Sequence, residues 1–231
     1  MIDIKTIGVW GFEGSLRGCR MPYESFDKSD SRMDRLADPK IIEFEREAKI
    51  MAENYGGVYT QSIGDADMKL CKKLIKAGSE HRKFMRMIHV QAEVKAPRYF
   101  WQEADKYKWV EANSSSTMHL ITKRELTIDD FSLDGGLSES TLIPIMNALN
   151  DGIREYNKVE GERKEAVFRA IKQLLPESYN QLRTIDTNYE CLLSIYHQRK
   201  NHRLSEWSGK NGFCSWISAL PYMKEFLEEA K

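Results

Sequence analysis

Residues 87–94 read MIHVQAEV, and apolar side chains alternate with polar ones along this stretch. Such alternation predicts a β-strand with one buried face and one wetter face. The side chains expected on the buried face are Ile88, Val90, Ala92 and Val94. Pro97 is expected to end the strand and to open a helix.

The segment PRYFWQEADKYKWV (97–110) is predicted to be that helix, and it is rich in aromatic rings. It carries Lys106 and Lys108, and the polar run 113–116 follows it. Two interpretations stay open at this point. The rings either pack a structural corner or form the wall of a site for a planar, phosphorylated ligand.

The remaining segments predict a mostly helical α+β protein, with a small mixed or antiparallel sheet and several long helices. We expect it to form a single domain over residues 1–231. A strand is expected over residues 2–11, and a long loop or short helix with Arg17 and Arg20 follows it. Helices are expected over 38–57, 64–78, 138–158 and 161–176, and one or two more over 213–231.

Residues 178–202, SYNQLRTIDTNYECLLSIYHQRKNH, predict one long amphipathic helix. On such a helix Asn188 and Arg199 are three turns apart and lie on nearly the same face. This arrangement suits a ring system that ends in a phosphate, because the arginine fork binds phosphate at two points. A surface ion pair is the alternative for Arg199. The expected core stripe comprises Leu182, Ile185, Tyr189, Leu192, Leu193 and Tyr196.

Composition excludes several classes of protein. The chain has 35 basic and 35 acidic residues, so it lacks the basic excess of duplex-binding domains, and nucleic acid is not expected as a partner. No apolar run is long enough to span a membrane, and the N-terminus does not resemble a signal peptide, so we expect a cytoplasmic protein. The motifs of hydrolase elbows, Rossmann folds and P-loops are also missing.

The cysteines and histidines give no sign of a metal site. Cys19, Cys71, Cys191 and Cys214 form no CxxC pair, so we expect four reduced thiols. The histidines lack the pairwise spacing of zinc ligands, and no metal is expected.

The ring-rich segment and the loop after it resemble the flavin-dependent thymidylate synthases. Members of that family have an R-H-R triplet nine residues after a similar proline, and then a loop of the form N-E-x-S-x-R. Counting from Pro97 without a gap places the triplet and the loop on Lys106, Tyr107, Lys108, Asn113 and Ser116.

The second half of the chain resembles the same family independently. The family has R-x-x-L-P, then N-x-R twelve residues beyond the proline, and then L-R eleven residues beyond the asparagine. The same count in this chain meets Lys172, Leu175, Pro176, Asn188 and Arg199, again without a gap. Glu206-Trp207 resembles the Q-W-E that follows, so the resemblance covers residues 78–216.

Several motif positions depart from the family pattern. The triplet has become Lys-Tyr-Lys, which keeps two charges but loses the guanidinium forks. The loop glutamate is Ser114, the loop arginine is Met118, and the arginine of N-x-R is Glu190. These changes indicate a divergent branch, of phage or prophage type.

The resemblance implies a homotetramer with active sites at subunit interfaces. It also implies conversion of the pyrimidine nucleotide dUMP to dTMP with FAD, NADPH and methylenetetrahydrofolate, without a cysteine nucleophile. Arg199 is the implied catalytic residue. The implied cofactor-binding residues are Lys106, Tyr107, Lys108, Asn113, Ser114, Asn188, His202 and Arg203. The implied substrate-binding residues are Lys172, Ser115, Ser116 and Arg199, with Lys172 reaching the nucleotide from another subunit.

Two alternatives to this thymidylate synthase interpretation remain at the level of sequence. One is a catalytically inactive nucleotide-binding or interaction protein on the same fold, and the other is an unrelated helical protein whose motif matches arise by chance.

Overall fold

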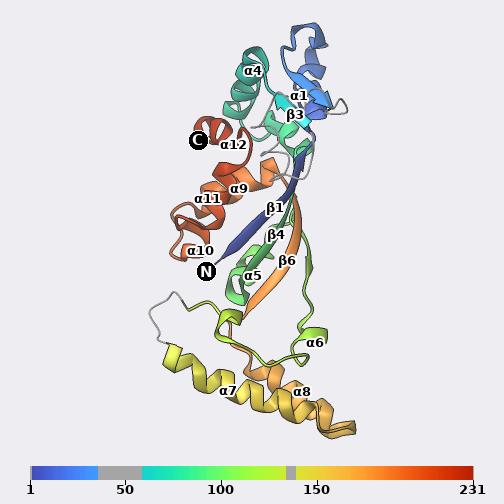
Figure 1. The fold of residues 1–231 in the computed structure, drawn as a ribbon. Helices are drawn as coiled ribbons and strands as arrows, with labels where there is room; N and C mark the ends of the chain where they lie inside the picture. The colour runs from blue at the N-terminus through green and yellow to red at the C-terminus, as the bar shows by residue number, and fades with distance from the viewer. Residues whose placement is uncertain (1, 36–58, 134–138, 231) are drawn as a thin grey trace, which may run out of the picture. The chain divides into compact units, whose positions relative to one another are not determined.

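The computed structural model describes residues 2–35, 59–133 and 139–230 (Figure 1). The chain divides into two compact units. Unit 1 comprises Met1–Asp3, Val94–Lys106 and Asn113–Arg183. Unit 2 comprises Ile4–Glu93, Tyr107–Ala112 and Thr184–Lys231.

Four strands form one sheet in the order β1-β4-β6-β5. Each unit contains part of the residues of these strands. In unit 1 the N–H of Arg98 donates to the Tyr179 carbonyl at 3.1 Å, and in unit 2 the N–H of Tyr189 donates to the Ile88 carbonyl at 3.0 Å. Residue numbers rise along one strand as they fall along the other, so β4 and β6 are antiparallel. The strands are β1 (Asp3–Trp10), β4 (His89–Pro97), β5 (Glu111–Ser114) and β6 (Asn180–Asn188).

The alternation along β4 is confirmed. Val90, Ala92 and Val94 are fully buried, while the polar residues between them are only partly covered. The strand begins at His89, where the ring of Trp10 stacks on the imidazole with 6.0 Å between centroids.

Unit 2 contains most of the described helices. In its core, aromatic rings meet edge to face: Phe12 contacts Tyr189 at 5.6 Å, and Tyr189 contacts Phe226 at 6.3 Å. The Trp216 indole of α11 donates to the Thr6 hydroxyl of β1 at 3.0 Å. Besides the strands of the four-stranded sheet, unit 2 contains α1 (Phe12–Arg20), η1 (Met21–Tyr23), η2 (Phe26–Lys28), β2 (Arg32–Arg35), β3 (Tyr59–Ser62), α4 (Asp65–Lys76), η3 (Arg82–Met87), α9 (Tyr189–Arg199), α10 (Ser205–Ser208), α11 (Phe213–Ala219) and α12 (Met223–Glu229).

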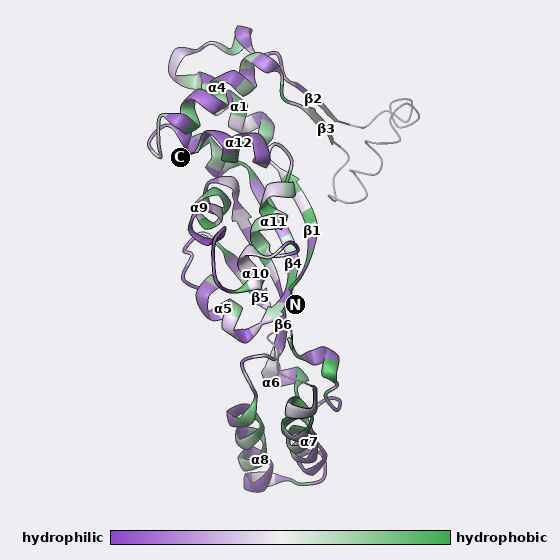
Figure 2. Cartoon of the chain, turned by 90° about the vertical axis from the view of Figure 1, so that its left-hand side faces the viewer, coloured by the Kyte–Doolittle hydropathy of each residue, from purple (hydrophilic) through white to green (hydrophobic). Residues whose placement is uncertain are grey.

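Unit 1 is built around two helices that lie side by side, α7 (Glu139–Tyr156) and α8 (Gly161–Leu174) (Figure 1). Both helices carry hydrophilic and hydrophobic residues along their length, as expected for helices with one buried face (Figure 2). Its other helical segments are α5 (Arg98–Ala104), α6 (Thr117–Leu120) and η4 (Ile128–Asp130). The buried core comprises Ile121, Leu126, Phe131, Leu142, Leu149, Ile153, Val167, Ile171 and Leu175.

The prediction of one long helix over 178–202 is wrong in its first half. Residues 180–188 form the strand β6, and α9 begins only at Tyr189. Leu182, expected in a core stripe, is 44% exposed, whereas Ile185 and Thr187 are buried in the strand. Ile185 and Thr187 are β-branched, and such side chains favour the pleated backbone of a strand.

Most other predicted elements are confirmed, with shifted ends. The first strand, the helices 64–78, 138–158 and 161–176, and two helices at the C-terminus are all present. The helix opened by Pro97 ends at Ala104, and the segment with Arg17 and Arg20 begins as helix α1. The predicted helix 38–57 lies outside the described residues. Within the described ranges, no helix has the length and apolarity that crossing a membrane requires.

Candidate functional site

The residues singled out from the sequence fall into two sets. Unit 1 contains Lys106, Asn113, Ser114, Ser115, Ser116 and Lys172, and unit 2 contains Tyr107, Lys108, Asn188, Arg199, His202 and Arg203.

In unit 2, Arg199 is held at the last residue of α9. Its Nε donates to the hydroxyl of Tyr107 at 2.8 Å, and the same hydroxyl donates to Oε1 of Gln198 at 3.2 Å. The tyrosine therefore fixes one edge of the Arg199 guanidinium.

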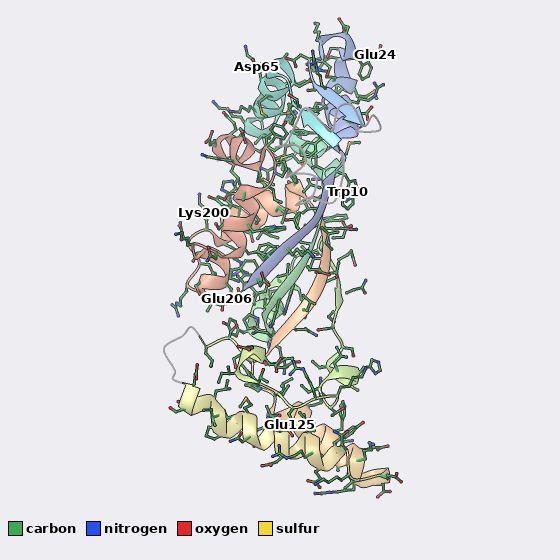
Figure 3. The ribbon with its side chains drawn as sticks, in the orientation of Figure 1. Trp10, Glu24, Asp65, Glu125, Lys200 and Glu206 are labelled. Atoms are coloured by element: carbon green, nitrogen blue, oxygen red, sulfur yellow. The ribbon has the colours of Figure 1, made fainter. Side chains whose placement is uncertain are left out.

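Two aromatic rings flank this guanidinium. Its central carbon lies 4.9 Å from the ring centroid of Trp207 and 5.7 Å from that of Tyr107. Trp207 is fully buried and packs edge-on against Phe213 at 5.6 Å. Cations are attracted to ring faces at such distances. Figure 3 labels Lys200 and Glu206, the chain neighbours of Arg199 and Trp207.

The turn after α9 uses His202 in two ways. Its Nδ1 accepts the Leu204 N–H at 3.2 Å, and its carbonyl accepts the Ser208 hydroxyl at 2.6 Å. The imidazole also meets the Trp207 ring edge-on at 6.3 Å. Arg203, the next residue, is exposed.

Asn188 is the N-cap of α9. Its backbone is extended, and its side-chain oxygen accepts the Cys191 N–H at 3.0 Å, which is a standard helix cap. Asn188 and Arg199 were expected on one face of a single helix. That expectation is wrong, because Asn188 precedes the helix that carries Arg199.

Glu190 stands where the family has an arginine, and it pairs with two cations of η3. Its carboxylate lies 3.2 Å from Nε of Arg82 and 3.9 Å from Nε of Arg86. Only 16% of its side chain is exposed. The negative charge is therefore balanced locally and does not act as an open source of repulsion.

In unit 1, Lys172 and the loop 113–117 come together. Nζ of Lys172, on α8, donates to the Thr117 hydroxyl at the start of α6. Ser116 is the N-cap residue of α6, and the Ser115 N–H donates to the Leu182 carbonyl of β6 at 2.8 Å. The Lys172 ammonium thus lies at the start of α6, directly after Ser115 and Ser116 in the chain.

Lys172 lies in a setting that disfavours its charge. Burial lowers the pKa of its ammonium, and the positive charge of Arg98 lowers that pKa further. Arg98 donates to the Leu175 carbonyl at 3.2 Å and approaches Glu177 at 3.4 Å. An anion bound beside Lys172 would relieve this penalty, so the cluster suits a phosphate.

The ring-rich segment divides between the two interpretations. Phe100 and Trp101 are buried, and the Trp101 indole donates to the carbonyls of Ala96 and Gln181 at 3.1 Å each. These rings form a structural corner of unit 1. In unit 2, Tyr107 supports Arg199, and Trp109 is 71% exposed. Lys106, Lys108, Asn113 and Ser114 are exposed as well.

No protein-family model matches the chain, and no curated protein matches it. Solved structures do. One is the crystal structure of thymidylate synthase X from Helicobacter pylori with FAD and dUMP, with a TM-score of 0.66 and 14% identity. A second structure of the flavin-dependent enzyme from that organism, also with FAD and dUMP, gives 0.67 and 15%. The alignments cover 100% and 99% of this chain, and 100% of each matched chain.

This chain has the fold of the flavin-dependent thymidylate synthases. The resemblance noted in the motifs is confirmed for the fold over the full length of the chain.

The thymidylate synthase fold brings in residues that the motifs did not single out. Arg98 and Thr117 join Lys172, and Gln198 joins Arg199 through Tyr107. Local spacing gave no signal for these partners, because Thr117 is 55 residues from Lys172 and Gln198 is 91 residues from Tyr107.

Proposed function

We propose that this protein binds dUMP and FAD as a divergent flavin-dependent thymidylate synthase. The carrying observation is the fold likeness over all of both chains to structures solved with those two molecules. A fold alone does not fix a function. Lys172 and Arg199 add support, because they lie at positions matched by the family's motifs.

In unit 1, we assign Lys172, Ser115 and Ser116 to the nucleotide phosphate. The ammonium supplies a point charge, and the serines supply short donors. Arg98 adds a second positive charge nearby. An anion bound there would stabilise the protonated amine of Lys172 and so raise its pKa, which burial and Arg98 lower.

In unit 2, we assign Arg199 to the uracil ring. A fixed guanidinium stabilises negative charge that develops on the ring as C5 becomes nucleophilic. Lys172 and Arg199 contact one nucleotide from different protomers of a homotetramer in this proposal, as the resemblance implies.

The residues present fit an anionic cofactor. Lys106, Lys108 and Arg203 are exposed cations, and Glu190 is neutralised by Arg82 and Arg86. We assign the first three, together with Tyr107, Asn113, Ser114, Asn188 and His202, to FAD. When bound, FAD supplies hydride transfer, with NADPH as reductant and methylenetetrahydrofolate as carbon donor.

Titration of the purified protein with FAD and then with dUMP tests the proposal. We expect saturable FAD binding, seen as a change in the visible flavin spectrum, and dUMP binding that alters that spectrum. Tritium release from dUMP labelled at C5, in the presence of NADPH and methylenetetrahydrofolate, then measures methyl transfer. Absence of both FAD and dUMP binding would overturn the proposal.

A second function keeps nucleotide binding but not catalysis. The changes at Ser114 and Met118 favour it, because both remove charged side chains that the family motif carries. Saturable dUMP binding without FAD binding or tritium release is the result that selects this alternative.

A further inference from the structure

We propose that Tyr107 is a positioning residue that fixes the direction of the Arg199 guanidinium. The effect of this positioning on nucleotide affinity rests on the proposed function. The positioning itself rests on the geometry of unit 2 alone.

The hydrogen bonds at Tyr107 have a defined direction. Its hydroxyl has one proton, and that proton is donated to Oε1 of Gln198 at 3.2 Å. The oxygen therefore presents a lone pair to Nε of Arg199, which donates at 2.8 Å. Gln198 and Arg199 are the consecutive residues at the end of α9, so the Tyr107 hydroxyl forms hydrogen bonds with two neighbouring side chains of that helix.

The Trp207 ring completes the support. The guanidinium lies 4.9 Å from its centroid, and the Tyr107 ring meets the Trp207 ring edge-on at 6.2 Å. Trp207 is fully buried, so it provides a rigid surface. The hydrogen bond to Tyr107 fixes one edge of the Arg199 guanidinium, and the Trp207 ring supports its position from a second direction.

This arrangement has a chemical consequence for the ligand. Arginine binds phosphate either end-on through its two terminal nitrogens or side-on through Nε and one terminal nitrogen. A ligand that used the Nε edge would have to displace Tyr107. The geometry therefore disfavours side-on capture of a phosphate through the Nε edge of Arg199.

The test begins with the Nε–H proton of Arg199, observed by NMR and assigned through its loss in Arg199→Lys. In the wild-type protein we expect slow exchange of this proton with water. Tyr107→Phe keeps the ring and removes the acceptor, and we expect exchange at least about ten-fold faster. Unchanged exchange would overturn the proposal, whether or not the protein binds dUMP.

The second measurement is the Kd for dUMP. We expect Tyr107→Phe to weaken binding about ten-fold. Tyr189→Phe is the matched control, because it removes a tyrosine hydroxyl that donates to the Pro221 carbonyl at 2.8 Å, in the same unit. Equal weakening in both variants would reduce Tyr107 to a structural role and contradict the proposal. A wild-type protein that binds no dUMP would contradict the proposed function instead.

Discussion

Lys172 in unit 1 and Arg199 in unit 2 are both cations that we assign to one nucleotide, and they are held in opposite ways. Lys172 donates to the Thr117 hydroxyl, and the like charge of Arg98 nearby lowers its pKa, so we expect its protonation to respond to a bound anion. Arg199 is fixed by a tyrosine edge and a tryptophan plane before any ligand arrives. The difference separates a point charge that adapts from a group whose direction matters.

The largest expected effect comes from replacing Arg199. Arg199→Ala should weaken dUMP binding by about 1.5–3 kcal/mol, because a charged hydrogen-bonding group is lost. Arg199→Lys should lose nearly as much, since an ammonium has neither the fork nor the planar stacking surface. Isothermal titration of each variant with dUMP measures both. Full affinity in Arg199→Lys would break the contrast with Lys172.

An intermediate effect is expected at Lys172. Lys172→Met should weaken dUMP binding by about 1.5 kcal/mol, because a charged donor to phosphate is removed. Lys172→Arg keeps the charge and should retain most of the affinity. The pair of variants sharpens the comparison, and a Lys172→Arg protein as weak as Lys172→Met would show that shape matters at both cations.

The pH dependence of dUMP binding should report on Lys172. Burial and Arg98 lower the pKa of this lysine, so it loses its proton at a lower pH than an ordinary lysine does. Affinity should therefore fall on the alkaline side as the positive charge disappears. Titrations across alkaline pH test this, and Lys172→Arg is the control, because any alkaline loss that it retains comes from another group.

The smallest effect is expected from Arg98→Gln. This change removes the like charge beside Lys172 and keeps a donor for the Leu175 carbonyl. The pKa of Lys172 should rise, and the alkaline fall in affinity should move to higher pH. A fall that stays in place, in a variant with unchanged thermal stability, would argue against electrostatic coupling between Arg98 and Lys172.

Part of this fold could be predicted from the sequence, because the pattern within β4 is local. The alternation of apolar and polar residues fits only a strand with one buried face, and the structure confirms that strand. Residues 178–188 were harder, since their apolar spacing also fits a helix. The strand form of β6 depends on distant partners, such as the Trp109 carbonyl that accepts the Thr187 hydroxyl at 2.8 Å.

The candidate site divides in the same way. The spacing of the motifs identified Lys172, Arg199 and Tyr107 as candidate site residues, and their roles in ligand binding are predictions. It could not reach the supports around them, because Thr117 and Gln198 act through tertiary contacts with residues far away in sequence. Composition and local spacing carry no record of such contacts.

Strand β6 passes into helix α9 at Asn188 without an intervening loop. Each residue of a helix turns the next by about 100° and advances it by about 1.5 Å. A single inserted residue inside α9 would therefore swing Arg199 to a different side of its own axis. We therefore expect insertions and deletions among relatives of this protein to lie outside the segment from β6 to the end of α9, because the length of α9 sets the direction of Arg199 relative to the strand.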